Sequence, residues 1–366
     1  MTYKATDGKD SHSNLEVQIV NTYPIGTGIG EYVSDLMKIG DFDCYSLIFK
    51  KSAAKSFTYP GTNFYSFIPG FSSKVEFLLN AYFQGIMYPK AQKIIKHKSG
   101  KGNIIHYSDP SVRPFINSKA CTVTIHDILA YYPDKTNGGF MNARYRYIVK
   151  NFLLYKSFRN VIAISNKTRE ELLDKGWDNN IVVIPYAISD SFKFINNKLQ
   201  ARAILGLPAD KFLILSISTN TPRKNLLAIK NTMDVLDERF ALVRVGPSVG
   251  NSITFDYIDN REKMNLLYNA CDVLLFPTLD EGFGRPVIEA MAAGLPTVVS
   301  DIKIMREIGG IAPFFSENSS ESYKEGILTV LSDVENYRQK GINQASNFSF
   351  EMFKKRMTSF YSKLSK

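Results

Sequence analysis

Short, strongly apolar segments recur along the chain, and each is followed by a longer stretch whose apolar residues have helical spacing. Segments that are apolar at nearly every position are typical of strands covered on both faces, as in parallel α/β sheets. Because strands and helices alternate in both halves, the sequence predicts two doubly wound, Rossmann-like α/β domains. The expected strands are residues 17–20, 45–49, 104–107, 121–125, 161–164 and 181–184 in the first half, and 212–217, 241–245, 273–276 and 297–300 in the second.

The length of 366 residues accommodates two domains of ordinary size. Residues 189–199 are polar and interrupt the alternation, so we expect an N-terminal domain over 1–188 and a C-terminal domain over 189–345. The last segment, 346–366, has one apolar face at helical spacing and is expected to form a helix that crosses back to the first domain.

Several classes of protein are excluded by simple features of the sequence. No apolar run reaches the about 18 residues of a membrane-spanning helix, and the polar start does not have the pattern of a secretory signal. The dispersed Cys44, Cys121 and Cys271 fit neither a disulfide framework nor a metal site. We therefore expect a cytoplasmic protein.

Positive charge is concentrated in residues 51–160, which hold 16 Lys or Arg and 4 Asp or Glu, while the whole chain has a net charge of +10. The same segment contains 20 aromatic residues and two expected helices, over 75–87 and 141–158. A basic surface rich in aromatic residues suits an anionic membrane, a nucleic acid or a phosphorylated substrate. A solvated basic face above an aromatic core is the alternative.

A glycine-rich loop over residues 23–30 follows the first expected strand and precedes a helical stretch. Glycines let the backbone approach a phosphate at a helix start. The spacing of Gly26, Gly28 and Gly30 does not match the dinucleotide fingerprint, which needs a glycine at the position of Glu31 and an acid about 20 residues further on. A phosphate-binding turn and a plain strand-to-helix turn both remain open.

Two glutamates flank a predicted helix start after the expected strand 273–276. Glu281 lies in a glycine-containing loop at the carboxyl end of that strand, where α/β sheets bind ligands, and Glu289 lies one turn into a helix that starts near Arg285. The backbone amides of Phe283, Gly284 and Arg285 are expected to face the same ligand. This arrangement suits a ligand with both hydroxyls and phosphates, such as a sugar nucleotide.

Two further strand ends carry chemistry. Arg223 and Lys224 follow the expected strand 212–217, and two adjacent cations can neutralise a diphosphate leaving group. His126 follows the expected strand 121–125, where it is a candidate substrate contact as well as a candidate structural residue.

Together these motifs resemble those of a retaining GT-B glycosyltransferase of the family-four type, over nearly the whole chain. The pair Glu281 and Glu289, spaced E-x7-E, is the most specific part of the resemblance. It implies two Rossmann-like domains that face each other across a cleft. It also implies transfer of a sugar from a nucleotide diphosphate sugar to an acceptor with retention of configuration, with the departing phosphate as the base and without a metal ion or another cofactor.

The resemblance assigns roles to the candidate residues. Glu281 and His126 would contact the hydroxyls of the donor sugar, and Glu289 the ribose of the nucleotide. Arg223 and Lys224 complete the catalytic set with Glu281 and His126. The diphosphate would be held by Arg223, Lys224 and the backbone of Gly28, Phe283, Gly284 and Arg285.

The chain departs from the family pattern at Ser218-Thr219, at Arg285 and over residues 310–317, which match the corresponding loop only loosely. Ser218 and Thr219 stand where many relatives have Gly-Arg, so one phosphate-binding cation is absent, and Arg223 is expected to take its place. Arg285 occupies a position that is often apolar, which is expected to influence donor choice.

The same sequence contains features of other classes of protein. Asp41 and Asp43 form a DxD pattern, which holds a metal ion in another glycosyltransferase fold, but their position before the second strand favours a surface turn. A pyridoxal-phosphate phosphorylase is disfavoured because no lysine has the context of a Schiff base. A sugar-nucleotide epimerase and a non-catalytic carbohydrate- or nucleic-acid-binding protein remain the alternatives.

The partners expected from the sequence are a nucleotide sugar, for which the resemblance favours GDP-mannose, and a glycan or lipid-linked acceptor, with no nucleic acid. The basic segment predicts peripheral attachment to an anionic surface on the inner face of the cell membrane. A soluble acceptor and a solvated basic face are the alternative. The candidate acceptor or membrane contacts are Arg144, Arg146 and Lys150, together with Lys90, Lys93 and Lys96, which follow Pro89.

Overall fold

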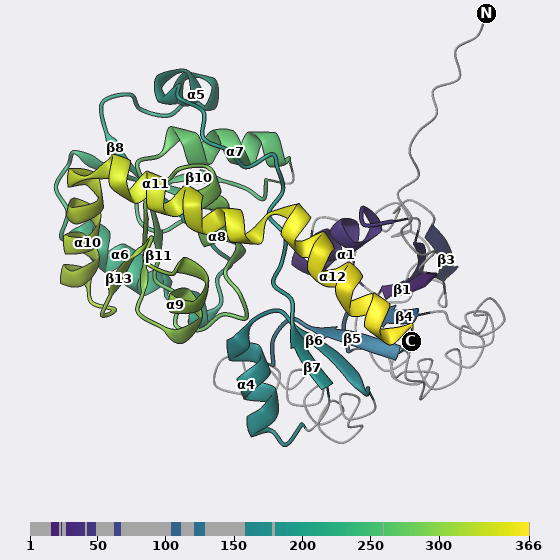
Figure 1. The fold of residues 1–366 in the computed structure, drawn as a ribbon. Helices are drawn as coiled ribbons and strands as arrows, with labels where there is room; N and C mark the ends of the chain where they lie inside the picture. Colours follow the sequence, from purple (N-terminus) through teal and green to yellow (C-terminus); the bar gives the residue numbers. More distant parts are fainter. Residues whose placement is uncertain are drawn as a thin grey trace, which may run out of the picture. The chain divides into compact units, whose positions relative to one another are not determined.

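A computed structural model describes much of the chain and shows two parallel-sheet α/β domains (Figure 1). In each sheet the first strand lies near the centre and the chain then builds out to one edge before it returns to build the other, as in doubly wound folds. The described residues are 16–21, 23, 27–40, 42–48, 62–66, 104–110, 121–128, 158–177, 180–258 and 260–365.

The N-terminal sheet has seven strands in the order β3-β2-β1-β4-β5-β6-β7. The pairs β1–β2, β2–β3, β1–β4 and β4–β5 are parallel. Strands β1, β4, β5 and β6 are buried along their whole length, which explains why they read as continuous apolar runs. The strands are β1 Val17–Asn21, β2 Asp43–Ile48, β3 Thr62–Ser66, β4 Ile104–Tyr107, β5 Cys121–Ile125, β6 Asn160–Ala163 and β7 Asn180–Val183.

The C-terminal sheet has six strands in the order β10-β9-β8-β11-β12-β13, and all its neighbouring pairs are parallel. Because every strand runs in the same direction, their carboxyl ends share one edge. The strands are β8 Phe212–Ile217, β9 Phe240–Val245, β10 Ile253–Phe255, β11 Val273–Phe276, β12 Thr297–Ser300 and β13 Phe314–Ser316.

Within the described ranges, helices follow most of the strands. The α-helices are α1 Gly28–Met37, α4 Asn166–Asp174, α5 Lys198–Leu205, α6 Leu226–Asp234, α7 Arg261–Ala270, α8 Arg285–Ala292, α9 Lys303–Gly309, α10 Ser320–Ser332, α11 Val334–Ala345 and α12 Phe350–Leu364. Two short 3-10 helices, η5 and η6, span Pro222–Lys224 and Ser346–Phe348.

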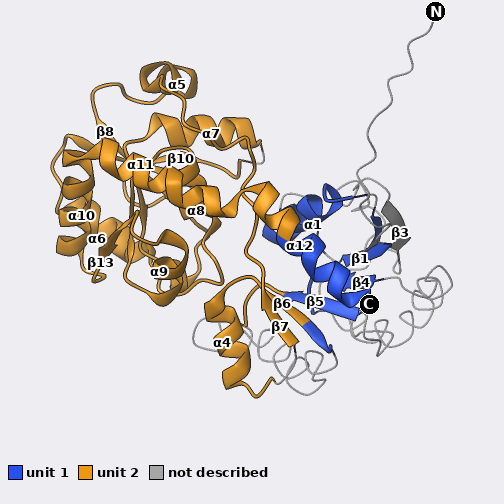
Figure 2. Cartoon of the chain, in the orientation of Figure 1, with its two compact units in different colours: residues 1–124, 157–160, 356–366 blue, residues 125–156, 161–355 orange. Residues whose placement is uncertain are grey.

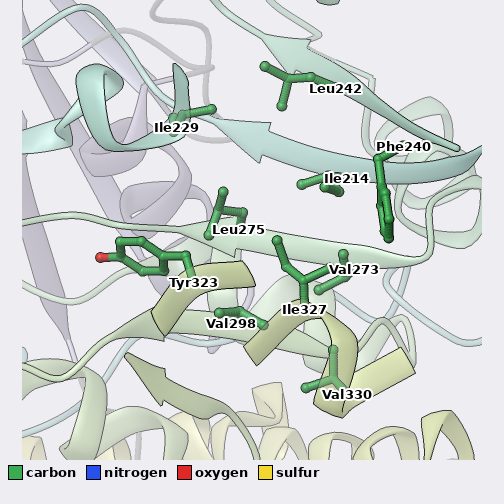
Figure 3. Close-up of a cluster of buried hydrophobic side chains, with 10 residues drawn as sticks. All are labelled: Ile214, Ile229, Phe240, Leu242, Val273, Leu275, Val298, Tyr323, Ile327 and Val330. Carbon is green, nitrogen blue, oxygen red and sulfur yellow. The ribbon is translucent and has the colours of Figure 1, made fainter. Parts of the chain in front are cut away.

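A cluster of apolar side chains forms the core of the C-terminal sheet (Figure 3). Side chains of the central strands meet residues of α6 and α10, and the buried Tyr323 of α10 shares a hydrogen bond of 3.0 Å with Ser300. This packing fixes the strands whose ends carry the candidate site. The cluster contains Ile214, Ile229, Phe240, Leu242, Val273, Leu275, Val298, Tyr323, Ile327 and Val330.

The chain divides into two compact units (Figure 2). The first contains 1–124, 157–160 and 356–366, and the second contains 125–156 and 161–355. The first unit therefore includes the last turns of the C-terminal helix, and the second includes strands after β5. The predicted domain limits at 188 and 345 stay a prediction.

The C-terminal helix α12 has the apolar stripe that the sequence indicates, since Phe353, Met357, Phe360 and Tyr361 are buried. Within the first unit, a chain of hydrogen bonds holds its last turns: the Tyr361 hydroxyl lies 2.6 Å from His106 Nδ1. The other ring nitrogen of the histidine lies 2.7 Å from Thr124 Oγ1. All of these side chains are buried, so the bonds are shielded from water.

Several sequence expectations need correction. Strands β3, β10 and β13 were not expected, because β3 is largely polar and the other two have only three residues each. The helix after the glycine-rich loop begins at Gly28 rather than Glu31, with the Thr27 side chain as its N-cap. Asp43 is the first residue of strand β2 and does not lie in a turn.

Other expectations fall outside the described residues. These are the helix over 75–87, the helix over 141–158 up to residue 157, and the aspartate at position 41. Phe158 is described and lies outside any helix. Within the ranges that the structure describes, no helix has the length and apolar character needed to cross a membrane.

Removing the Tyr361 hydroxyl should destabilise the first unit. Tyr361→Phe deletes the bond to His106 in a buried place, which costs about 1–3 kcal/mol of unfolding free energy. Chemical denaturation of the variant measures this loss. Lys363→Ala, an exposed change on the same helix, is the control and should leave stability within about 0.5 kcal/mol of the parent. A Tyr361→Phe variant as stable as the control would contradict the structural role of this bond.

Candidate functional site

The candidate site is built on the loops that follow two neighbouring strands, β8 and β11. The loop after β8 contains η5, with Arg223 and Lys224, and the loop after β11 contains Glu281. The two loops are joined through the Arg223 backbone carbonyl, which accepts hydrogen bonds from the Leu279 amide at 2.7 Å and from Thr278 Oγ1 at 3.0 Å. The backbone therefore fixes how the cations meet the carboxylate.

The Glu281 carboxylate binds both cations. Arg223 Nη1 lies 2.7 Å from Glu281 Oε2, and Lys224 Nζ is paired with Oε1. Thr278 Oγ1 lies 3.3 Å from Oε1, and Arg223 also donates to the Asp280 carbonyl at 3.0 Å. The structure thus joins Glu281 to Lys224, which lies 57 positions earlier in the sequence, and to the neighbouring Arg223.

The charged side chains of the site are largely buried, which strengthens their electrostatic interactions. Glu281 is 7% exposed, and the side chains of Lys224 and Arg223 are 13% and 21% exposed. Burial lowers the pKa of Lys224 below the ordinary lysine value, and repulsion by Arg223 adds to this, while attraction by Glu281 opposes it. Since charges in such a place are poorly screened, an anion that replaced Glu281 as their partner would be bound strongly.

Two glycines shape the loop between the glutamates. A side chain at Gly282 would overlap the His126 carbonyl oxygen, so the two backbones are in close contact. Gly284 has φ of +99°, and a side chain there would overlap Met305, so the residue before α8 needs glycine on both counts. The helix then starts at Arg285, as the sequence predicts.

Glu289 lies one turn into α8, where Tyr268 Oη donates to its Oε2 at 3.0 Å. Arg285 Nε lies 3.4 Å from Glu289 Oε1. These contacts hold the carboxylate on the side of the helix that faces α7. A carboxylate with spare acceptor capacity in such a place can bind ligand hydroxyls.

His126 is 9% exposed, and its Nδ1 lies 2.5 Å from the hydroxyl of Tyr186. The two rings also stack, and the ring of Phe283 packs edge-on against Tyr186. The Arg285 guanidinium lies 5.5 Å from the centre of the Tyr186 ring. His126 is therefore close to the loop of Glu281 both through Gly282 and through these rings.

Phe283 has a structural side chain. Its ring is 3% exposed and contacts Tyr186 and Phe348. Only its backbone amide is left for the ligand role expected from the sequence. Gly28 is the first residue of α1, and a side chain there would meet no neighbouring atom within 4 Å.

Sequence reasoning missed a second group of charges beside the same loop. Lys167 of α4 pairs with Asp280 at 2.9 Å and with Glu171 at 2.7 Å. Burial lowers the pKa of this lysine, but its hydrogen bonds with the two carboxylates outweigh burial and raise it. Ser165 also donates to the Gly282 carbonyl at 3.0 Å. The partners of Lys167 and Ser165 in this loop are more than a hundred positions away, and no local pattern signals them.

The remaining predicted residues lie outside the described part of the chain. They are Arg144, Arg146 and Lys150, together with Lys90, Lys93 and Lys96. Over the part of the chain that is described, no group of three or more His, Cys, Asp or Glu side chains has the geometry to hold a metal ion.

With the geometry established, the chain can be compared with known protein families. Residues 197–348 match the family "Glycosyl transferases group 1", and residues 57–192 match "Glycosyltransferase Family 4". The two matches together cover most of the chain. The chain belongs to the GT-B glycosyltransferases, as the resemblance of its motifs predicted.

Particular relatives are distant. The chain is 21% identical over 250 residues to "O-antigen chain mannosyltransferase RfbU" of Salmonella typhimurium, covering 64% of this chain and 67% of that protein. It is 27% identical over 221 residues to "Serotype-specific mannosyltransferase WbdA" of Escherichia coli, covering 52% of this chain and 27% of that protein. The chain therefore spans about a quarter of the length of WbdA.

The fold is shared with solved structures. Anabaena Alr3699/HepE, solved in complex with UDP and glucose, has a TM-score of 0.71 and 16% sequence identity. The match covers 96% of this chain and all of that one. It confirms the expected fold class of two parallel-sheet α/β domains.

The electrostatic coupling at the site can be tested on the protein alone. Glu281→Gln removes the negative charge that raises the pKa of Lys224, so that pKa should fall further. Acetylation followed by mass spectrometry at a series of pH values should then show Lys224 reacting at lower pH in the variant. Lys167 is the internal control, because its partners are Glu171 and Asp280. An unchanged Lys224 profile, or an equal shift at both lysines, would contradict the coupling.

Proposed function

We propose that the protein transfers a sugar, with retention of configuration, from a nucleotide diphosphate sugar to a glycan acceptor. The observation that carries this proposal is the Glu281 carboxylate held by Arg223 and Lys224 at the carboxyl ends of β8 and β11. That edge of a parallel sheet is where α/β folds bind ligands. The site offers cations for a diphosphate and a carboxylate for sugar hydroxyls, side by side.

The proposed reaction uses these groups as follows. Arg223 and Lys224 neutralise the diphosphate, and Glu281 accepts hydrogen bonds from the donor sugar. The bond between the sugar C1 and the phosphate oxygen breaks, and a bond from C1 to the acceptor oxygen forms on the same face. The acceptor proton passes to the departing phosphate. The cations stabilise the negative charge that develops on the leaving group.

Glu289 is proposed to bind the ribose of the nucleotide. Its carboxylate is held by Tyr268 and Arg285, which leaves acceptor sites for the ribose hydroxyls. His126, close to the loop of Glu281, is proposed to contact an outer hydroxyl of the donor sugar.

For the donor we propose GDP-mannose. RfbU and WbdA are both named mannosyltransferases, which supports a mannosyl donor. HepE, by contrast, was solved with UDP and glucose. A screen of GDP- and UDP-sugars, with acceptor and without, separates these donors and also separates transfer from epimerisation, which needs no acceptor.

The proposed reaction needs no divalent ion, because Arg223 and Lys224 already neutralise the leaving group. Activity should therefore survive incubation with EDTA within about twofold of the untreated protein. The measurement is product formation before and after chelation, with magnesium added back. Loss of activity that magnesium or manganese restores would contradict the proposal and return attention to Asp41 and Asp43.

The two glutamates should differ in kind. Glu281→Gln should lower turnover and alter sugar choice while the protein still binds free nucleoside diphosphate, because it removes the partner of the sugar hydroxyls. Glu289→Ala should weaken binding of the free nucleoside diphosphate by roughly tenfold, the worth of a hydrogen bond to a charged group. Calorimetry and steady-state kinetics measure the two effects.

The control for both changes is Glu321→Gln, at an exposed position in the first turn of α10. It should leave binding and turnover unchanged. Normal nucleotide binding by Glu289→Ala would refute the ribose role, and normal turnover by Glu281→Gln would refute the sugar role.

We also propose that the enzyme acts in the cytoplasm, on the inner face of the cell membrane, with a lipid-linked acceptor. The support is the excess of basic and aromatic residues over 51–160. Vesicle co-sedimentation tests it: binding to anionic but not neutral vesicles is expected, and Arg144→Glu with Arg146→Glu should reduce it. The paired control is Lys354→Glu with Lys355→Glu, two exposed lysines of α12. Equal, negligible binding to both vesicle types would contradict membrane docking.

A further inference from the structure

Arg244 carries a buried positive charge that the proposed reaction has not used. It lies in β9 opposite Ser216 of β8, one residue from the carboxyl end of its strand, and is 0% exposed. Its guanidinium donates to Ser216 Oγ at 2.9 Å, to the Pro247 carbonyl at 3.2 Å and to the Ser218 carbonyl at 3.0 Å. It also donates to Ser218 Oγ from both terminal nitrogens, at 3.3 and 3.2 Å.

All of these partners are neutral oxygens, and among the described residues no carboxylate pairs with Arg244. Burial lowers the pKa of this guanidinium to about 10, so it still carries its charge at neutral pH. A buried cation without an anion destabilises a fold. An anionic ligand bound nearby would offset the cost of burying this charge.

Ser218 links Arg244 to the surface of the site. It follows β8 directly and is partly exposed. Its hydroxyl oxygen accepts two N–H groups of Arg244, which occupy both of its lone pairs, so its O–H is available only as a donor. The position of the loop is fixed as well, because a side chain at Gly246 would overlap the Ser218 carbonyl oxygen.

The Ser218 hydroxyl lies in the loop that also carries the cations proposed to bind the diphosphate. Ser218 and the pair Arg223 and Lys224 belong to the same loop after β8, the strand between β9 and β11. A donor hydroxyl backed by a buried cation at this strand end offers an anion both a hydrogen bond and a positive charge.

We propose that Arg244 is a positioning residue, which holds the Ser218 hydroxyl as a hydrogen-bond donor to the diphosphate of the nucleotide and places its buried positive charge behind it. This inference rests on the proposed function, because it deepens the account of the same donor site. The ligand is a nucleoside diphosphate, free or carrying a sugar. The group that touches it is Ser218, and Arg244 acts through Ser218.

The test compares charged and uncharged ligands of the full chain. Calorimetry measures the affinity for GDP and for UDP. The affinity for guanosine or uridine is measured by displacement of the bound diphosphate. Ser218→Ala should weaken diphosphate binding by about tenfold to a hundredfold, as expected for a hydrogen bond to a charged group, and leave nucleoside binding unchanged. A merely structural change would weaken both ligands together.

Coupling between the two residues is the second part of the test. Arg244→Lys keeps the charge but cannot donate from two fixed nitrogens to Ser218, so it should also weaken diphosphate binding selectively. The double variant should bind the diphosphate about as well as the single variant of lower affinity, because both changes remove the same contact. Arg239→Gln, an exposed arginine just before β9, is the control and should bind as the parent does.

The outcomes separate the two proposals. If the parent binds neither GDP nor UDP, the proposed function is wrong and this inference falls with it. If the parent binds a diphosphate and Ser218→Ala binds it equally well, only the inference is overturned. Because Ser218 is partly exposed, the Ser218→Ala variant should fold. The test therefore remains valid even if the Arg244→Lys variant does not fold. Additive effects in the double variant would also overturn the positioning role.

Discussion

One carboxylate shared by two cations is the interaction on which the candidate site depends. Glu281 neutralises Arg223 and Lys224 where all three are largely buried, and the backbone contacts between the loops after β8 and β11 hold them together. Without that carboxylate, two adjacent positive charges would face each other in a poorly solvated place. The pairing with Glu281 therefore holds both cations in position, where a diphosphate, which carries more negative charge, can bind them.

This constraint explains the organisation around it. The parallel sheet brings the ends of β8, β9 and β11 to one edge, and the cluster of apolar side chains in Figure 3 keeps the strands in place. The glycines at 282 and 284 allow the loop to pass close to His126 and to Met305. The sheet, the apolar core and the two glycines together therefore determine where Arg223, Lys224 and Glu281 lie.

The sequence predicts the parts of this arrangement that local patterns encode. Strand 273–276 is apolar throughout, and the helix after it begins at the glycine-arginine step that the sequence marks. The sequence also predicts that Lys224 and Glu281 lie at the same edge of the sheet, because both follow the carboxyl ends of parallel strands. Short strands such as β13 leave no pattern, and the partners of Lys167 and Arg244 are set by neighbours distant in sequence or on another strand. Such contacts follow from the folded sheet rather than from spacing.

We propose that Arg223, Lys224 and Glu281 form the site of a nucleotide-sugar donor. Lys224→Ala tests it most directly, in a transfer assay with the donor selected by screening. The variant should lose about 10²–10³-fold in rate, the worth of one preorganised electrostatic contact to a leaving group. Lys230→Ala, an exposed lysine of the next helix, should match the parent. A Lys224→Ala enzyme within twofold of the parent would contradict the account.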